Sequence, residues 1–430
     1  MFNRRVVVTG LGVVTPVGGD TATFWAALVA GRSGAGPVMA YATPEPALSY
    51  AAEVKDFTPE RAGLPRKRVK MMGRQAQLAF AAAAQAWQDA GLAGAGVPPG
   101  RVGLILGVGM LNADVTELGR AFDAMTRAGA SGESDPVSFG RVGAPELFPL
   151  WLLRHIPNLA AAHASIALDA QGPSNTIATG CVAGANAIGE AARLVARGDA
   201  DVVLAGGTDA RVTPLGTLRY RELGWLATRT GVDPVTVSAP FDEHACGFVS
   251  GEGAGILVLE SLDHAQSRGA RIDAELLAYA AANDGGDPLV PNPEGTALEH
   301  AIARCLVRAE LTAEAVDAVF APAPSVPTLD RATAAALSRV FGRSGSRAGI
   351  TATRSLLGHT HAASSALDCV AAVRSLGDGR IPAIANLHRP VADLPFVRGG
   401  ARAAAVRSAV VGAYGFGGHA ATLVFGGCGQ

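Results

Sequence analysis

Two stretches of this chain repeat one pattern, and the repeat limits the folds that the chain can adopt. Residues 176–203 (TIATGCVAGANAIGEAARLVARGDADVV) and 350–381 (ITATRSLLGHTHAASSALDCVAAVRSLGDGRI) each suggest a strand, a tight turn of small residues and an Ala-rich helix. A Gly-Asp turn into an apolar segment ends both stretches. Internal self-similarity indicates a duplicated chain. We therefore predict two halves, 1–260 and 261–430, that share one site.

Strand and helix patterns alternate along the rest of the chain, which predicts an α/β fold with largely parallel sheets. Residues 111–160 are less regular, and we expect them to form insertions over the mouth of a site. The predicted elements are strands at 5–14, 101–110, 199–207, 253–261 and 271–281, and helices at 72–92 and 263–270.

Composition excludes several classes of function. The chain has 430 residues, of which 49% are hydrophobic and 17% charged, so it can bury a large core. The net charge of −1 provides no field that would recruit nucleic acid or an anionic membrane. The one dense basic run, RKRVK at 66–70, favours a solvated helix start, although an acidic carrier protein could dock there. No apolar stretch reaches membrane-spanning length without polar interruption.

The cysteines indicate a reducing compartment and no metal centre. The five cysteines show no CxxC pair and no metal-ligand spacing, which predicts reduced thiols in the cytoplasm. The N-terminus opens directly into a strand pattern without a signal-peptide core. The glycines at 415–418 lack the strand–GxGxxG–helix context of a phosphate cradle, so no cofactor is predicted. The cysteines lie at positions 181, 246, 305, 369 and 428.

Cys181 is the candidate nucleophile. It follows an apolar strand pattern and opens a helix, where the helix dipole and free N–H groups favour a thiolate. The competing interpretation is a buried small hydrophobic residue, and this is the favoured one for the other four cysteines. His359 falls in the equivalent turn of the second half of the repeat. The duplication therefore predicts that this thiol and this imidazole meet.

Several motifs together resemble the β-ketoacyl-ACP synthase family of condensing enzymes, over essentially the whole chain. This resemblance implies an α/β thiolase fold, in which duplicated halves give a five-layer αβαβα sandwich. The motifs are VVVTGLGVVTPVG (6–18), GPSNTIATGCVAG (172–184), DADVVLAGGTDA (199–210), PFDEHACGFVSGEGAGILVLE (240–260), TRSLLGHT (353–360) and GFGG (415–418).

The resemblance implies decarboxylative condensation. A cysteine takes an acyl group from acyl carrier protein, and two histidines help to decarboxylate malonyl carrier, whose enolate attacks the thioester. By this likeness Cys181 is the nucleophile and His359 is one of the two histidines. The N–H groups of Cys181 and Phe416 form the oxyanion hole, and Phe416 is also a gate on the malonyl side.

The chain departs from the family pattern at the other catalytic positions. The second histidine falls on Pro322, the glutamate on Thr333 and the active-site lysine on Arg354. Proline cannot stabilise an enolate through its side chain, so the sequence predicts a loss of condensation chemistry. Arg354 is expected to make a structural ion pair. His419, after the glycine loop, is a candidate for compensation, although an exposed or hydrogen-bonded structural histidine is the favoured interpretation.

Two further expectations concern the second half of the chain. His361 lies two residues past His359, and we expect its side chain to point elsewhere along the helix start. His359 itself is either a site residue or a polar residue that only holds the turn.

The pattern of residues in 319–342 (VFA…VP.LD.A.A.A…VFG) resembles that of the chain-length factor, or ketosynthase β subunit, of type II polyketide synthases. Typical members carry Gln at the nucleophile position, whereas this chain keeps Cys181. The leading hypothesis is a subunit that forms a heterodimer with a catalytic ketosynthase through residues 165–177 and works with acyl carrier protein. The alternatives are a thioester-dependent acyltransferase and a complete β-ketoacyl-ACP synthase, both using Cys181.

Overall fold

The computed structural model describes residues 4–43, 45, 48–109, 115–129, 135–342 and 347–427. Its main feature is one ten-stranded sheet in the order β10-β9-β13-β14-β8-β1-β7-β6-β4-β5. The strands are β1 (Val6–Val14), β4 (Val102–Val108), β5 (Ser174–Ile177), β6 (Val202–Ala210), β7 (Glu252–Ser261), β8 (Ala274–Asn283), β9 (Ala318–Phe320), β10 (Gly349–Thr351), β13 (Ser408–Gly415) and β14 (His419–Gly426). Two small ladders join β2 (Gly36–Pro37) to β3 (Tyr50–Ala51) and β11 (Arg380–Ile381) to β12 (Arg402–Ala403).

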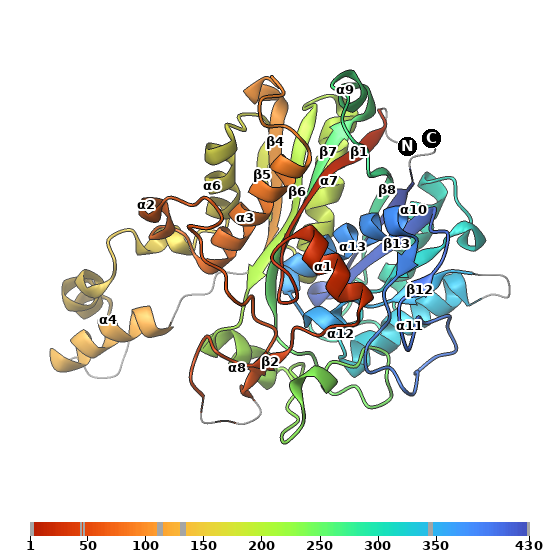
Figure 1. Ribbon diagram of the computed structural model, residues 1–430. Coiled ribbons are helices and arrows are strands. Elements are labelled where there is room, and N and C mark those ends of the chain that lie inside the picture. The colour runs from red at the N-terminus through yellow and green to blue at the C-terminus, as the bar shows by residue number, and fades with distance from the viewer. Residues whose placement is uncertain are drawn as a thin grey trace.

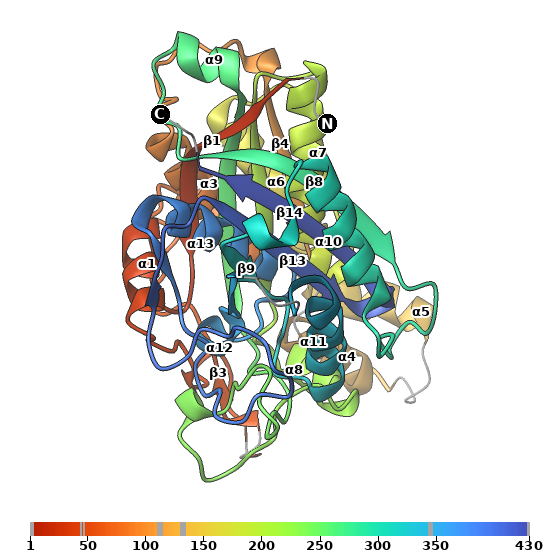
Figure 2. The same cartoon turned by 90° about the vertical axis from the view of Figure 1, so that its right-hand side faces the viewer.

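Helices divide this sheet into the five layers that the resemblance implies (Figures 1 and 2). On one outer face α3 (Arg74–Asp89) and α6 (Asn158–Leu168) cover the half of the sheet formed by β1, β7, β6, β4 and β5. On the other outer face, α10 (Thr296–Arg308) and α11 (Pro327–Phe341) cover the half formed by β8, β14, β13, β9 and β10. Between the two halves of the sheet lie α7 (Ala183–Arg197) and α13 (Ser364–Asp378). The remaining helices are α1 (Thr21–Val29), α2 (Arg66–Val69), α4 (Val115–Arg127), α5 (Pro136–Ser138), α8 (Pro214–Glu222), α9 (Leu262–Ser267) and α12 (Arg354–Leu357).

The prediction of largely parallel sheets was wrong, because the sheet is mixed. β5, β4 and β6 are parallel, as are β10, β9 and β13, whereas the five other neighbouring pairs are antiparallel. The glycine loop joins β13 directly to β14 and is too short for a crossover helix. Residues 211–251 form a wide return that pairs Ala210 with Glu252 at the same end of the sheet.

The repeat seen in the sequence is present in three dimensions. A 3-10 turn at Gly180–Val182 leads into α7, and a 3-10 turn at His361–Ala363 leads into α13. Both helices have 15 residues and end at a left-handed glycine. Each half thus presents one turn to the centre of the molecule. The division of the chain at residue 260 stays a prediction.

Glycines allow the two central turns to approach each other. A Cβ atom on Gly207 of β6 would lie 2.3 Å from the carbonyl oxygen of Ala362, and one on Gly184 of α7 would lie 2.7 Å from the same atom. The Ala185 N–H also donates to Ser365 Oγ at 2.9 Å, which links the start of α7 to the start of α13. The second turn therefore rests directly on the backbone of the first half.

The insertion at 111–160 differs from its expected place. Helix α4 packs against residues 139–146 and projects from one side of the layered body, so it does not cover the two central turns (Figure 1). Residues 110–114 and 130–134 lie outside the described part of the chain. Among the described helices, none combines the length and the apolar character needed to cross a bilayer.

We predict that Gly207→Ala destabilises the protein by about 1–3 kcal/mol, because the added methyl group collides with backbone that cannot give way. Gly377→Ala is the matched control, since nothing lies within 4 Å of the methyl group it would add to α13. That control should be neutral or stabilising by about 0.5–1 kcal/mol. Denaturant unfolding measures both, and equal stability of the two variants would contradict the close approach.

Candidate active site

Cys181 lies at the centre of the molecule, in the 3-10 turn before α7. Only 4% of its surface is exposed. The strand that precedes it was expected to be apolar, but the residues of β5 (Ser-Asn-Thr-Ile) are mostly polar and are half-buried or exposed. The reason is its position as the last strand of the described sheet, where only β4 pairs with it. From the second half of the chain, His359 and the glycine loop at Gly415 lie against the thiol.

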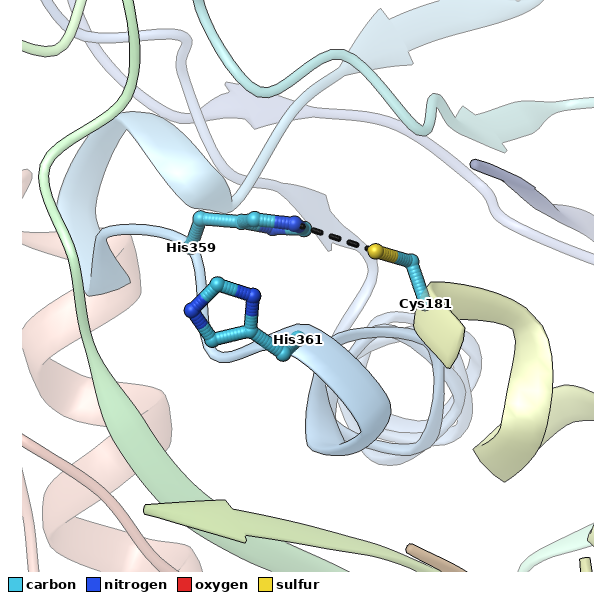
Figure 3. A group of neighbouring side chains, drawn as sticks. All are labelled: Cys181, His359 and His361. Carbon is cyan, nitrogen blue, oxygen red and sulfur yellow. Dashed lines mark hydrogen bonds between the residues drawn. The ribbon is translucent and has the colours of Figure 1, made fainter. Parts of the chain in front are cut away.

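The imidazole of His359 contacts the thiol. Its Nε2 atom lies 3.2 Å from Cys181 Sγ, as the dashed line in Figure 3 marks. On the other side of the ring, Nδ1 lies 3.4 Å from Ser364 Oγ, and that hydroxyl lies 3.0 Å from Thr360 Oγ1. When the thiol proton points at Nε2, the imidazole carries its own proton on Nδ1, and this N–H points at Ser364 Oγ. Because a hydroxyl can donate or accept, Ser364 is compatible with the tautomer in which Nε2 accepts the thiol proton, and also with the one that carries its proton on Nε2.

The thiol is neutral at rest, in contrast to the thiolate that the helix position predicts. Burial raises the pKa of Cys181 to about 11, although the charges of Arg211 and Arg354 oppose this rise. Burial, with the same two guanidinium groups, holds the pKa of His359 well below its usual value. Loss of water thus outweighs the helix start. The pair consists of an uncharged thiol and an uncharged imidazole.

The expectation that His361 points away from the site was wrong. Its ring lies beside that of His359, with ring centres 4.5 Å apart (Figure 3). One nitrogen from each histidine and Cys181 Sγ all lie within 4.8 Å of one another. The backbone explains the error, because His361 has a φ of +50° and the i, i+2 geometry of a regular helix does not apply. The sequence signal that could have placed His361 in the site was the occurrence of two histidines separated by one residue, His359-Thr360-His361.

Aromatic rings close the site, and sequence reasoning missed most of them. Tyr220 stacks on His361 at 4.7 Å, and Phe248 lies 4.9 Å from His359, both between ring centres. Phe416 stacks on Trp225 at 3.9 Å between ring centres. Tyr220 on α8 and Trp225 lie in the part of the wide return that has no recognised motif, whereas Phe248 and Phe416 lie in motifs that the sequence analysis identified.

The glycine loop approaches the thiol closely, since a Cβ atom on Gly415 would lie 2.9 Å from Cys181 Cβ. Phe416 follows directly and belongs to the short turn Phe416–Gly418. Its roles in an oxyanion hole and as a gate stay predictions.

Two buried ion pairs flank the dyad. Arg211 lies 3.1 Å from Asp209, and Arg354 lies 3.1 Å from Asp368. Arg354 also donates to the carbonyl oxygen of Ala321 at 3.1 Å. Both guanidinium groups lower the pKa of Cys181, and each outweighs the opposing effect of Asp209, so the field at the thiol is positive. Buried charges that are already paired cost no reorganisation when a negative charge develops.

The structure also places the other positions singled out in the sequence. Pro322 is buried, with its ring against Gly412 of β13. Thr333 is buried on α11, and its hydroxyl has no hydrogen-bond partner among the described residues. His419 is exposed, with Nδ1 3.3 Å from the Asn283 amide nitrogen, and is outside the Cys181 cluster.

The remaining thiols lie apart from the described cluster. Cys305 and Cys369 are buried, and Cys246 is half-buried. Cys428 lies outside the described residues.

The thiol and the two imidazoles also have the donor chemistry of a zinc site. The positive charges of Arg211 and Arg354 nearby act against a dication at the same place. The donor set therefore fits an anionic ligand better than a metal ion.

Comparison with known proteins settles the family. Residues 3–265 match the Beta-ketoacyl synthase N-terminal domain, and residues 273–388 match the C-terminal domain. The chain belongs to the β-ketoacyl synthase family. It is 36% identical to 3-oxoacyl-[acyl-carrier-protein] synthase 2 of Synechocystis sp., over 98% of each chain. It is 34% identical to the enzyme of the same name from Coxiella burnetii, over 99% of each chain.

Solved structures confirm the thiolase-like α/β fold. The ishigamide ketosynthase/chain length factor superposes with a TM-score of 0.86 at 32% identity, covering 99% of this chain and 100% of that one. A type II polyketide synthase acyl-carrier protein in complex with its ketosynthase bound to the hexaketide gives the same TM-score and coverage at 27% identity.

We predict that Cys181 reacts slowly with iodoacetamide at pH 7 and faster as the pH rises. With its pKa raised to about 11, about one thiol in 10,000 is ionised at pH 7, so the rate should rise about tenfold per pH unit up to pH 10. Intact mass against time measures the rate, and Cys181→Ala identifies the adduct. A rate that levels off near pH 8 would mean an ordinary or activated thiol.

Proposed function

We propose that this protein accepts an acyl group from an acyl carrier protein on Cys181, as a thioester-dependent acyltransferase of the β-ketoacyl synthase family. The observation that carries the proposal is the 3.2 Å contact between Cys181 Sγ and His359 Nε2. A nucleophile with its base at hydrogen-bond distance, and that base oriented by a third group, is the arrangement that acyl transfer needs. Ser364 is the orienting group here.

The uncharged state of the dyad determines the order of events. His359 Nε2 takes the thiol proton as Sγ attacks the thioester carbonyl, because a free thiolate is too costly in this buried site. The oxyanion forms next to the positive field of Arg211 and Arg354, which lowers its energy. Collapse expels the carrier thiolate, which takes the proton back from His359. The products are the acyl-cysteine and the free carrier thiol.

A basic surface supports a carrier protein as the acyl donor. Arg66 and Lys67 of α2 are exposed and stand in the RKRVK run. Exposed cations of this kind attract an acidic partner. The names of the curated relatives also specify an acyl-carrier-protein substrate.

We expect an acyl thioester of carrier protein or coenzyme A to add its acyl mass to the wild-type protein but not to Cys181→Ala. His359→Gln should slow this acylation by about 100-fold or more, since it removes the base. Cys246→Ala is the control thiol variant and should be acylated like the wild type. Intact mass spectrometry gives each rate, and an unmodified wild type, or an adduct on Cys181→Ala, would disprove the proposal.

A second candidate function is that of a chain-length factor paired with a catalytic ketosynthase. The edge strand β5 has only β4 as a described neighbour, so its outer side is available for pairing with another chain. Ile166 on the adjoining α6 is 64% exposed. Pro322 in place of a histidine and the likeness to the ishigamide ketosynthase/chain length factor favour a subunit that shapes its partner's pocket.

We predict that Ile166→Asp disrupts pairing through this edge, because it places a charge in an apolar contact. Val307→Asp is the matched control, since Val307 is 78% exposed on α10, on the opposite outer layer. Native mass spectrometry after co-expression with a ketosynthase that carries both family histidines distinguishes a heterodimer from a homodimer. Equal pairing of both variants would place the interface elsewhere.

A further inference from the structure

His361 is a buried polar group without a hydrogen-bond partner in the described part of the chain. It is 1% exposed, and neither ring nitrogen has a hydrogen-bond partner among the described residues. Its ring is nonetheless held firmly, by stacking on Tyr220 with an interplanar angle of 16° and by an edge contact with Phe248. Buried polar groups in folded proteins are nearly always satisfied. A fixed and unsatisfied imidazole next to a nucleophile therefore points to a ligand that is absent from the free protein.

The backbone gives an independent reason to assign a function to this ring. His361 begins its 3-10 turn with a φ of +50°, and Gly180 begins the equivalent turn of the first half with a φ of +60°. Thr179 and Thr360 precede the two turns with similar backbone angles. Glycine suits this left-handed position, whereas a residue with a Cβ atom is strained there. Strain of this kind is characteristic of functional sites.

The surroundings identify the charge of the ligand. Burial holds the pKa of His361 well below its usual value, and His359 and Arg211 lower it further, so the imidazole is uncharged. An uncharged imidazole offers one N–H donor. Donors in a positive field, with the guanidinium groups of Arg211 and Arg354 close by, suit an oxyanion.

We propose that His361 is the second imidazole of this site, and that it donates to the enolate oxygen formed from a β-carboxyacyl thioester, with His359 as the other donor. This inference rests on the proposed acylation of Cys181 and extends it to carbon–carbon bond formation. Pro322, at the position where the family resemblance puts a histidine, supplies no donor. The missing imidazole is thus provided from the turn that already holds His359.

The chemistry balances as follows. In a malonyl thioester the bond between the carboxylate and the α-carbon breaks, CO2 leaves, and its electron pair forms the enolate. Acylated Sγ no longer directs a proton at His359 Nε2, so the single imidazole proton can move to Nε2 while Ser364 donates to Nδ1. His359 and His361 then both donate to the enolate oxygen. The enolate carbon then forms a bond to the acyl carbon on Cys181 and expels the thiolate. One proton, taken up through His359, restores the thiol and leaves a β-ketoacyl thioester.

The test uses purified full-length protein, acylated at Cys181 and then mixed with malonyl-acyl carrier protein that has a labelled carboxyl carbon. Wild type is expected to release labelled CO2. His361→Leu keeps a side chain of similar bulk without a donor and should lower CO2 release by about 100-fold. Its acylation of Cys181 should fall by less than about tenfold, a split that a purely structural defect would not give. His361→Gln restores a donor and should recover part of the release.

The controls separate this inference from the proposal on which it rests. His419→Leu removes an exposed histidine and should leave CO2 release at the wild-type level. Acylation without CO2 release in the wild type would overturn the role of His361 and keep the acyltransferase proposal, whereas absent acylation would overturn both. Equal release by wild type and both His361 variants would also overturn the inference. So would stoichiometric zinc in the purified protein that disappears in His361→Leu.

Discussion

The close contact between the start of α7 and the start of α13 is the constraint on which the rest of the site depends. Gly184 and Gly207 leave no side chain between the two turns, and Ala185 hydrogen-bonds to Ser365 across the gap. Each turn is short and makes little contact with solvent, so the two sheet halves must pack on both sides of the helix pair to hold it. The contact between Cys181 and His359 follows from this backbone arrangement.

Burial then sets the electrostatics. The pKa of Cys181 rises from 9.0 to about 11, which makes its ionisation about 3 kcal/mol less favourable. The field at a helix start is typically worth about 0.3–1 kcal/mol, so it cannot compensate. The interior tolerates the charges of Arg211 and Arg354 because each guanidinium group is paired with a carboxylate. The two paired guanidinium groups therefore produce a positive electrostatic potential at the thiol, although neither is an unpaired charge. Such a potential stabilises a negative charge that appears only transiently in a reaction.

Much of this architecture could be predicted from the sequence. The repeat predicted the central pair of turns because the same local pattern folds in the same way twice, and the motifs identified the layers. Strand direction could not be predicted from local patterns, since it depends on where residues 211–251 return to the sheet. The aromatic residues Tyr220 and Trp225 escaped notice because their place in the site is determined by tertiary packing alone.

The misplacement of His361 has a more specific physical origin. Sequence reasoning assumed a regular helix start, in which residues two apart face different ways, but the left-handed backbone at His361 turns its ring back towards His359. Such a position costs roughly 1–2 kcal/mol for a residue other than glycine, and an unsatisfied buried imidazole costs roughly 1–3 kcal/mol more. Gly180 at the equivalent position has neither cost. A ligand oxygen that accepts from His361 would recover the second of these costs on binding, so the stability lost in the free protein becomes affinity for an anion at the thiol.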